Sequence, residues 1–128
     1  MEPDLTNNQK IVLQTLEKSE QPLGAYSILF NVEKKGIKSP QQVYRALDKL
    51  ITIGAVHKIE SLNSYIACKH KECKARESTS FLICQDCQRV FEILEADLSD
   101  KFLKVSKKSN FKYSTHNLEI FGVCKTCS

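Results

Sequence analysis

Apolar residues recur at helical spacing three times in the first half of the chain. The first stripe follows a capping box of Thr6 and Gln9, in which each side chain bonds the other residue's backbone N–H, and it extends to about residue 19. The second stripe covers residues 23–32, between a Gln-Pro break and a stop at Gly36. These patterns predict two amphipathic helices.

The third helix has the clearest start. Ser39 can accept the capping hydrogen bond, and Pro40 takes the first helical position, where its missing N–H costs nothing. Its apolar stripe runs from Val43 to Ile51 and stops before Gly54. The opposite face carries Gln41, Gln42, Tyr44, Arg45, Asp48 and Lys49. Exposed Tyr and Arg beside two Gln favour a binding role for this face.

Two β-prone runs follow, at 56–60 and 64–68, and Leu62-Asn63 is the predicted two-residue turn between them. Three helices and then a hairpin is the order of a winged helix-turn-helix. With that turn, His57 pairs directly with Cys68 and their Cβ atoms lie about 5 Å apart, so the two side chains can share a metal. The alternative is that His57 is an ordinary strand residue and Cys68 a small buried one.

An imidazole and a thiolate are half of a zinc site, so further ligands must come from later in the chain. The candidates are His70, Cys73, Glu77 and Glu92.

The second half begins with a charged stretch, 69–80, that reads as a linker. Short strands at 81–83 and 90–94, a helix from Asp97 and a strand at 112–121 are predicted after it. The expected fold class is therefore α+β. It comprises a winged-helix domain at 1–68, the linker at 69–80 with candidate metal ligands, and a small α/β domain at 81–128.

Two Cys-x-x-Cys pairs bracket this last domain: Cys84 with Cys87, and Cys124 with Cys127. Each turn can place two thiolates on one tetrahedral ion, and two turns complete a closed zinc site with no open position for chemistry. The site is thus predicted to be structural, tying down the end of this domain. Two disulfides, or one redox-active Cys-x-x-Cys, are the alternatives.

Composition narrows the classes of function. The net charge of +4 is small and spread out, so a DNA-binding role must rest on pattern and not on bulk charge. No apolar run is long enough to cross a bilayer, and six cysteines without a leader peptide suggest a reducing, cytoplasmic location. Neither a His-Glu-x-x-His helix nor a His-x-Glu partner for a deaminase is present, so no enzyme and no small-molecule substrate is expected.

Three strings resemble the zinc uptake regulator branch of the ferric uptake regulator family: Gln-Val-Tyr-Arg-Ala-Leu-Asp at 42–48, Val-His-Lys-Ile-Glu-Ser at 56–61 and Asn-Ser-Tyr at 63–65. Both Cys-x-x-Cys pairs follow in order, so the resemblance extends from about residue 6 to 127. It implies a homodimer joined through the C-terminal domain, which binds palindromic operator DNA and represses zinc-uptake genes when zinc is plentiful.

The resemblance also implies two zinc ions per chain, one structural and one regulatory. The branch's regulatory ligands fall on His57, Cys68, Glu77 and Glu92, although histidine is usual where Glu77 stands. His70, Cys73 and His116 are the alternates. Sensors of iron, manganese or peroxide with the same fold compete with this interpretation, as does a zinc-stabilised interaction module without DNA contact.

In a helix-turn-helix the third helix enters the major groove with its N-terminal half against the base edges. Arg45 is predicted to pair with guanine or a phosphate, Gln42 with adenine, and the ring of Tyr44 to pack on a thymine methyl. Lys49 and Lys58 are expected at phosphates. The full set of predicted DNA contacts is Tyr26, Gln41, Gln42, Tyr44, Arg45, Lys49 and Lys58.

Overall fold

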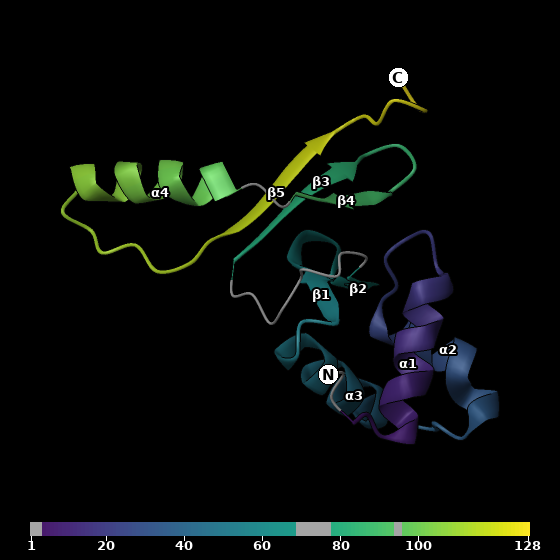
Figure 1. The fold of residues 1–128 in the computed structure, drawn as a ribbon. Helices are drawn as coiled ribbons and strands as arrows, with labels where there is room; N and C mark the ends of the chain where they lie inside the picture. The colour runs from purple at the N-terminus through teal and green to yellow at the C-terminus, as the bar shows by residue number, and fades with distance from the viewer. Residues whose placement is uncertain (1–3, 69–77, 94–95) are drawn as a thin grey trace. The chain divides into compact units, whose positions relative to one another are not determined.

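The computed structural model describes residues 4–68, 78–93 and 96–128, and the chain divides into two compact units, Met1–Arg76 and Glu77–Ser128 (Figure 1). Both units mix helices with strands, which confirms the predicted α+β class. None of the described helices has the length and apolarity needed to span a bilayer. The first unit contains α1 (Asn7–Lys18), α2 (Ala25–Val32), the 3-10 turn η1 (Glu33–Lys35), α3 (Pro40–Thr52), β1 (Val56–Ile59), the 3-10 turn η2 (Glu60–Leu62) and β2 (Ser64–Ala67).

The predicted helix starts of α1 and α3 are confirmed. The hydroxyl of Thr6 accepts from the N–H of Gln9 at 3.2 Å, and Oε1 of Gln9 accepts from the N–H of Thr6 at 2.9 Å. Ser39 caps α3 in the same way, with proline at the start of the helix. Gly36 has φ of 102°, a left-handed conformation that favours glycine and ends the second helical segment. Local signals therefore set the ends of these helices.

The apolar stripes of the three helices meet in one core. Val12, Ile28, Val43 and Leu47 are fully buried. The hairpin packs on this core through the buried ring of Tyr65, and backbone hydrogen bonds in both directions join Leu23 to Tyr65 as an extra bridge beside β2. The N-terminal unit therefore has its own hydrophobic core. This core fixes the β1–β2 hairpin, which is the wing of the winged helix, against the helices.

The predicted hairpin register is wrong by two residues. His57 pairs with Ile66 and Ile59 pairs with Ser64, so His57 and Cys68 are not direct partners. The cause is the turn, which includes η2 and ends at Asn63 with φ of 47°, and so is longer than two residues. A slip of two keeps every side chain on its predicted face, because side chains alternate with a period of two.

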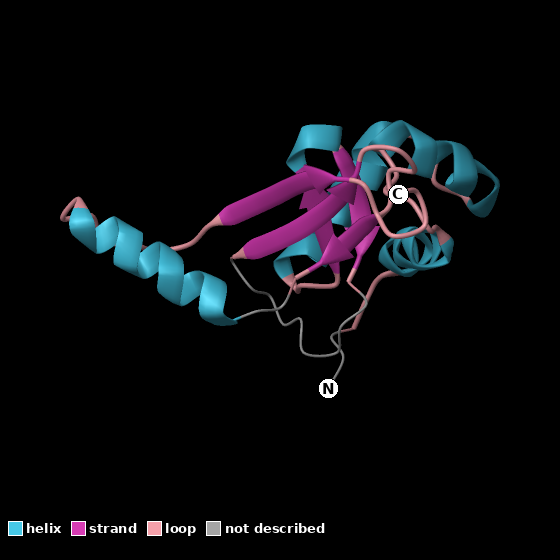
Figure 2. Ribbon diagram, turned by 90° about the horizontal axis from the view of Figure 1, so that it is seen from above, coloured by secondary structure: helices cyan, strands magenta, loops and turns pink. Residues whose placement is uncertain are grey.

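The second unit contains a three-stranded sheet in the order β4-β3-β5, which Figure 2 shows from above. It comprises β3 (Thr79–Cys84), β4 (Val90–Glu92), α4 (Ala96–Lys108) and β5 (Asn117–Gly122). Strand β4 pairs antiparallel with β3, and β5 pairs parallel with it. The helix α4 extends beyond the sheet in both ribbon views (Figures 1 and 2).

Two sequence predictions for this unit need correction. The last strand was expected at 112–121, but β5 begins only at Asn117. Residues 112–116 before it are irregular, and within them the side chain of His116 contacts the hydroxyls of Tyr113 and Ser80. Thr79 and Ser80, assigned to the linker from the sequence, belong to β3.

Candidate functional site

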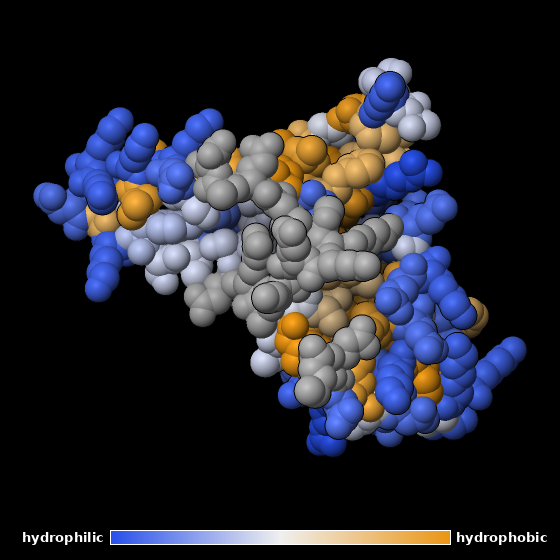
Figure 3. All heavy atoms as spheres, viewed as in Figure 1, coloured by the Kyte–Doolittle hydropathy of each residue, from blue (hydrophilic) through white to orange (hydrophobic). Residues whose placement is uncertain are grey.

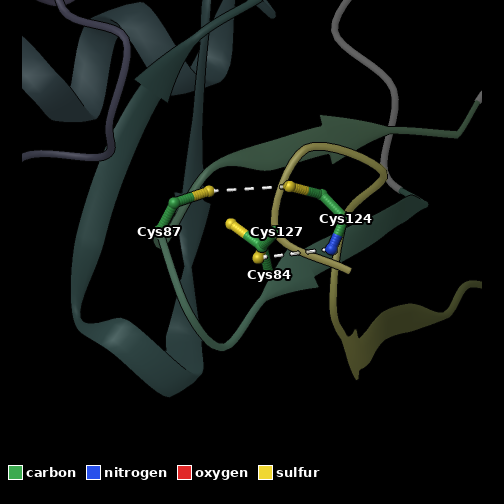
Figure 4. Close-up of side chains that lie close together, drawn as sticks. All are labelled: Cys84, Cys87, Cys124 and Cys127. Atoms are coloured by element: carbon green, nitrogen blue, oxygen red, sulfur yellow. Dashed lines mark hydrogen bonds between the residues drawn. The ribbon is translucent and has the colours of Figure 1, made fainter.

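The four cysteines of the two Cys-x-x-Cys pairs converge in the second unit (Figure 4). Their sulfur atoms all lie within 4.8 Å of one another. Cys84 is the last residue of β3, and Cys87 lies in the turn that leads to β4. Cys124 and Cys127 follow the end of β5. Since β3 and β5 are parallel neighbours, both turns emerge at the same end of the sheet.

Backbone hydrogen bonds shape each cysteine turn. In the first, the N–H of Gln88 donates to the carbonyl of Cys84 at 3.0 Å, and Gln88 takes a left-handed φ of 64°. In the second, the N–H groups of Cys127 and Ser128 donate to the carbonyl of Cys124. The N–H of Gln85 also bonds to the carbonyl of Gly122 at 2.8 Å, which joins the first turn to the end of β5.

The sulfur atoms differ in their preference for a proton. Backbone N–H groups of Cys87 and Cys124 point at the Cys84 sulfur and lower the pKa of that thiol to about 6. The hydrogen bond of Cys127 to the Cys124 sulfur, together with burial, raises the pKa of Cys127 to about 12. Four thiolates at this spacing repel one another, so a cation is required to hold them all deprotonated.

The spacing fits zinc. Four sulfurs at about 2.3 Å from a central ion form a tetrahedron with edges of about 3.8 Å. The sulfurs of Cys87 and Cys124 are 3.8 Å apart, far beyond the roughly 2 Å of a disulfide. All four residues are free cysteines. The cluster can therefore hold one zinc ion with no open position, as the sequence predicts.

The second predicted site lies on the wing. His57 is buried in β1, and Cys68 follows β2, where its N–H donates to the carbonyl of Ala55 at 2.8 Å. Their ligand atoms lie within 4.8 Å of each other, although the two residues are diagonal and not direct neighbours in the ladder. The structure thus brings a histidine nitrogen and a cysteine sulfur together. Glu92 is the last residue of β4 in the second unit, whereas Glu77, His70 and Cys73 lie outside the described residues.

The alternate ligand His116 is engaged elsewhere in the second unit. Its Nδ1 is 2.6 Å from the hydroxyl of Tyr113, and its Nε2 is 3.0 Å from the hydroxyl of Ser80. Its ring also packs on Phe102 of α4, with centroids 4.7 Å apart. These contacts hold α4 and the segment before β5 to the sheet. Sequence reasoning missed Ser80 and Tyr113, because nothing local marks them as partners of a histidine.

The predicted DNA-contacting side chains lie on the outer surface of the first unit. Gln41, Tyr44, Arg45 and Lys49 are exposed along one side of α3, and Tyr26 is 71% exposed near the start of α2. Gln42 is only half-exposed. Lys58, on β1, is partly exposed and forms an ion pair with the exposed Glu60 at 3.5 Å, a surface contact of little energetic weight.

A further feature not foreseen from the sequence is an apolar row across the sheet of the second unit. Leu82, Phe91 and Ile120 are register partners on three adjacent strands, and each is more than 40% exposed. They line a pocket together with Phe121 and Val123 (Figure 3 shows hydrophobic side chains over these strands). The consecutive apolar residues at 81–84, 90–91 and 120–121 are a sequence signal of a sheet with apolar residues on both faces.

The first unit consists of three helices and a hairpin, and its third helix presents a polar outer face. Joined to a four-cysteine unit, this arrangement is that of a DNA-binding transcriptional regulator of the winged-helix class. The sequence model of the ferric uptake regulator family matches residues 4–121, and the chain belongs to this family. The family consists of regulators and not of enzymes, as the absence of catalytic motifs led us to expect.

The curated relatives include both zinc and ferric uptake regulation proteins. The zinc uptake regulation protein of Escherichia coli is 32% identical over 124 residues, which cover 96% of this chain and 72% of that protein. The ferric uptake regulation protein of Legionella pneumophila is 29% identical over 123 residues, 91% of this chain and 85% of that protein.

Two solved structures are similar along nearly the whole chain. Holo XcZur has a TM-score of 0.86 at 32% identity, with coverage of 98% of this chain and 87% of that one. A zinc uptake regulator complexed with zinc and DNA has a TM-score of 0.86 at 30% identity, with coverage of 96% and 82%.

Proposed function

We propose that the protein is a cytoplasmic, zinc-responsive transcriptional repressor that binds palindromic operator DNA as a homodimer and controls zinc-uptake genes. The observation that carries the proposal is the meeting of a histidine nitrogen and a cysteine sulfur on the wing of the DNA-binding unit. This donor pair suits zinc better than magnesium, calcium or manganese, which prefer oxygen ligands. The similarity to regulators named for zinc uptake supports the same metal.

Each chain would hold two zinc ions with different tasks. Cys84, Cys87, Cys124 and Cys127 would bind the structural ion, which supplies no chemistry and ties the segment after β5 to the turn after β3. His57 and Cys68 would bind the regulatory ion, and by resemblance Glu77 and Glu92 would complete that site. His70, Cys73 and His116 are the alternate ligands. His116 is the least favoured, because binding a metal would cost it a bond to Ser80 or Tyr113.

The second unit supplies a surface suited to a second copy of the chain. Each residue of the apolar row of Leu82, Phe91 and Ile120 is more than 40% exposed, and β5 is an edge strand of the described sheet with Phe121 49% exposed. An edge strand can pair with another chain, and an exposed apolar patch often marks an interaction surface. Burying the row between two copies would place two winged-helix units in one assembly, as a palindromic operator requires.

Regulation would then act through geometry. Zinc on the wing would fix the positions of the two recognition helices α3 in the dimer, so that both reach half-sites on one face of the DNA. Without the regulatory ion the helices would sample other spacings and affinity would fall. A ligand set that bridges the wing and later residues is suited to this role, because a metal holds its ligands in one geometry.

The proposal is tested by operator binding in zinc-buffered solutions. The operator is first obtained by selection from random DNA with the zinc-loaded protein, and binding of wild type, His57→Ala and Cys68→Ser is then measured against free zinc. Both variants should lose zinc-dependent binding and remain folded dimers. A normal zinc response of His57→Ala would refute the sensing site. Selection of no palindrome would refute the DNA-binding function.

Iron and manganese titrations in the same assay decide the second candidate function. A zinc sensor should bind the operator at a lower free concentration of zinc than of iron or manganese. A sensor of iron or manganese should show the opposite order. The nitrogen and sulfur donors of His57 and Cys68 argue for zinc.

A further inference from the structure

The two adjacent glutamines at the start of α3 are in different situations. Gln42 is the third residue of the helix, and its side chain closes a capping box with Ser39. Its Oε1 accepts from the N–H of Lys38 at 2.8 Å and from the N–H of Ser39 at 3.3 Å. Its own N–H donates to the hydroxyl of Ser39 at 3.3 Å. The side chain of Gln42 is thus part of the helix terminus.

This engagement conflicts with reading adenine. A glutamine recognises adenine by accepting from N6–H with its amide oxygen while its NH₂ donates to N7. An amide oxygen has two lone pairs, and the N–H groups of Lys38 and Ser39 occupy both of those on Gln42. Gln42 keeps only its NH₂ for DNA, and a donor alone does not distinguish the N7 of adenine from that of guanine. Adenine readout by Gln42 would require opening the cap.

Gln41 lies on the side of the helix that faces outward. It is exposed, and the residues three and four positions further along, Tyr44 and Arg45, are exposed as well. Residues at this spacing form one stripe on a helix. Four residues after Gln42, by contrast, is Ala46, which is 3% exposed and belongs to the core. Gln42 therefore lies at the border between the core and the outward stripe.

We infer that Gln41 is the glutamine that determines base specificity, and that Gln42 is a positioning residue that fixes the start of the recognition helix. The inference rests on the proposed operator binding. It assigns the stripe of Gln41, Tyr44 and Arg45 to the base edges and gives Gln42 no share in sequence selection.

The test compares Gln41→Ala, Gln42→Ala and Gln42→Glu in the full-length, zinc-loaded protein. Affinity is measured for operator variants with each base pair at each position, and the thermal midpoint of the N-terminal unit is measured in parallel. Gln41→Ala should relax the preference at one A·T pair per half-site by about 5- to 150-fold and leave the midpoint unchanged. Gln42→Ala should lower the midpoint by about 4–8 °C and weaken binding to all variants alike.

Gln42→Glu separates capping from base reading. A carboxylate accepts the same two N–H groups, so the midpoint should return to the wild-type value. The base preference should stay as in wild type, even though an added negative charge lowers affinity for all DNA. A change of preference at one base pair in either Gln42 variant, or an unchanged preference in Gln41→Ala, would overturn the inference. If wild type itself discriminated no sequence, the proposed function would fail, which is a different result.

Discussion

Removing zinc from the four-cysteine site should unfold the second unit and leave the first unit folded. Of seventeen buried apolar residues in the described part of the chain, only Phe81, Ile83 and Cys84 belong to the second unit. Full burial of Phe81 and Ile83 contributes about 3–6 kcal/mol together. A structural zinc ion contributes about 10–16 kcal/mol. The metal therefore stabilises this unit more than its buried side chains do, whereas the first unit has its own core.

The assay is two-dimensional amide NMR on the full chain before and after treatment with a strong zinc chelator. Amide signals of α1, α2 and α3 should keep their positions, while those of β3 and β5 should collapse into the narrow range of an unfolded chain. Cys127→Ser should reproduce the effect without chelator, and Cys68→Ser, a cysteine outside the cluster, should not. Dispersed β3 and β5 signals in a protein that metal analysis shows to be free of zinc would refute the stabilising role of the ion.

Three further predictions concern other parts of the molecule. Gly36→Ala should cost about 1–2 kcal/mol of stability in urea unfolding of the first unit, because a residue with a side chain is strained at φ of 102°. The strain comes from the backbone alone, since no atom lies within 4 Å of the added Cβ. Unchanged stability would contradict this. Ile120→Glu should convert the proposed dimer to a monomer in sedimentation, whereas the control Phe30→Glu, on the exposed surface of α2, should not. An intact Ile120→Glu dimer would rule out the apolar row as the interface. Acidification should release the structural zinc, because protons compete for the thiolates. A zinc-binding dye should therefore detect increasing release as the pH falls, and retention of the ion on acidification would contradict thiolate ligation.

The helices of the first unit were predictable because their signals are local. A Thr or Ser cap, a proline at the first position and a glycine stop act within a few residues, and all of them hold in the structure. The same capping-box pattern also links Ser39 to Gln42, so the capping role of Gln42 was open to sequence reasoning. We withdraw Gln42 from adenine readout because its amide oxygen already accepts two backbone hydrogen bonds.

The sequence predicted that the wing exists but did not predict its strand register. The length of the turn before Asn63 depends on a single left-handed residue, and the sequence favoured a shorter turn. The meeting of His57 and Cys68 survived this error because a two-residue slip preserves the face of each side chain. The four-cysteine cluster was more secure, since each pair is local and only their convergence depends on the fold.

The second unit was harder to predict because its contacts are distant in sequence. The bond of His116 to Ser80 and the parallel pairing of β3 with β5 join segments more than thirty residues apart. No local pattern indicates which residue will face His116. The structure brings His57 and Cys68 together, but the regulatory ligand set of His57, Cys68, Glu77 and Glu92 stays a prediction.

The most direct test of two zinc ions with separate tasks is metal analysis of the purified, zinc-saturated protein beside Cys68→Ser and Cys127→Ser. Wild type should hold two zinc ions per chain and Cys68→Ser one, and Cys68→Ser should keep a folded second unit and lose zinc-dependent operator binding. Cys127→Ser should lose the structure of the second unit. Two ions retained by Cys68→Ser, or a single ion in wild type, would refute the two-site assignment.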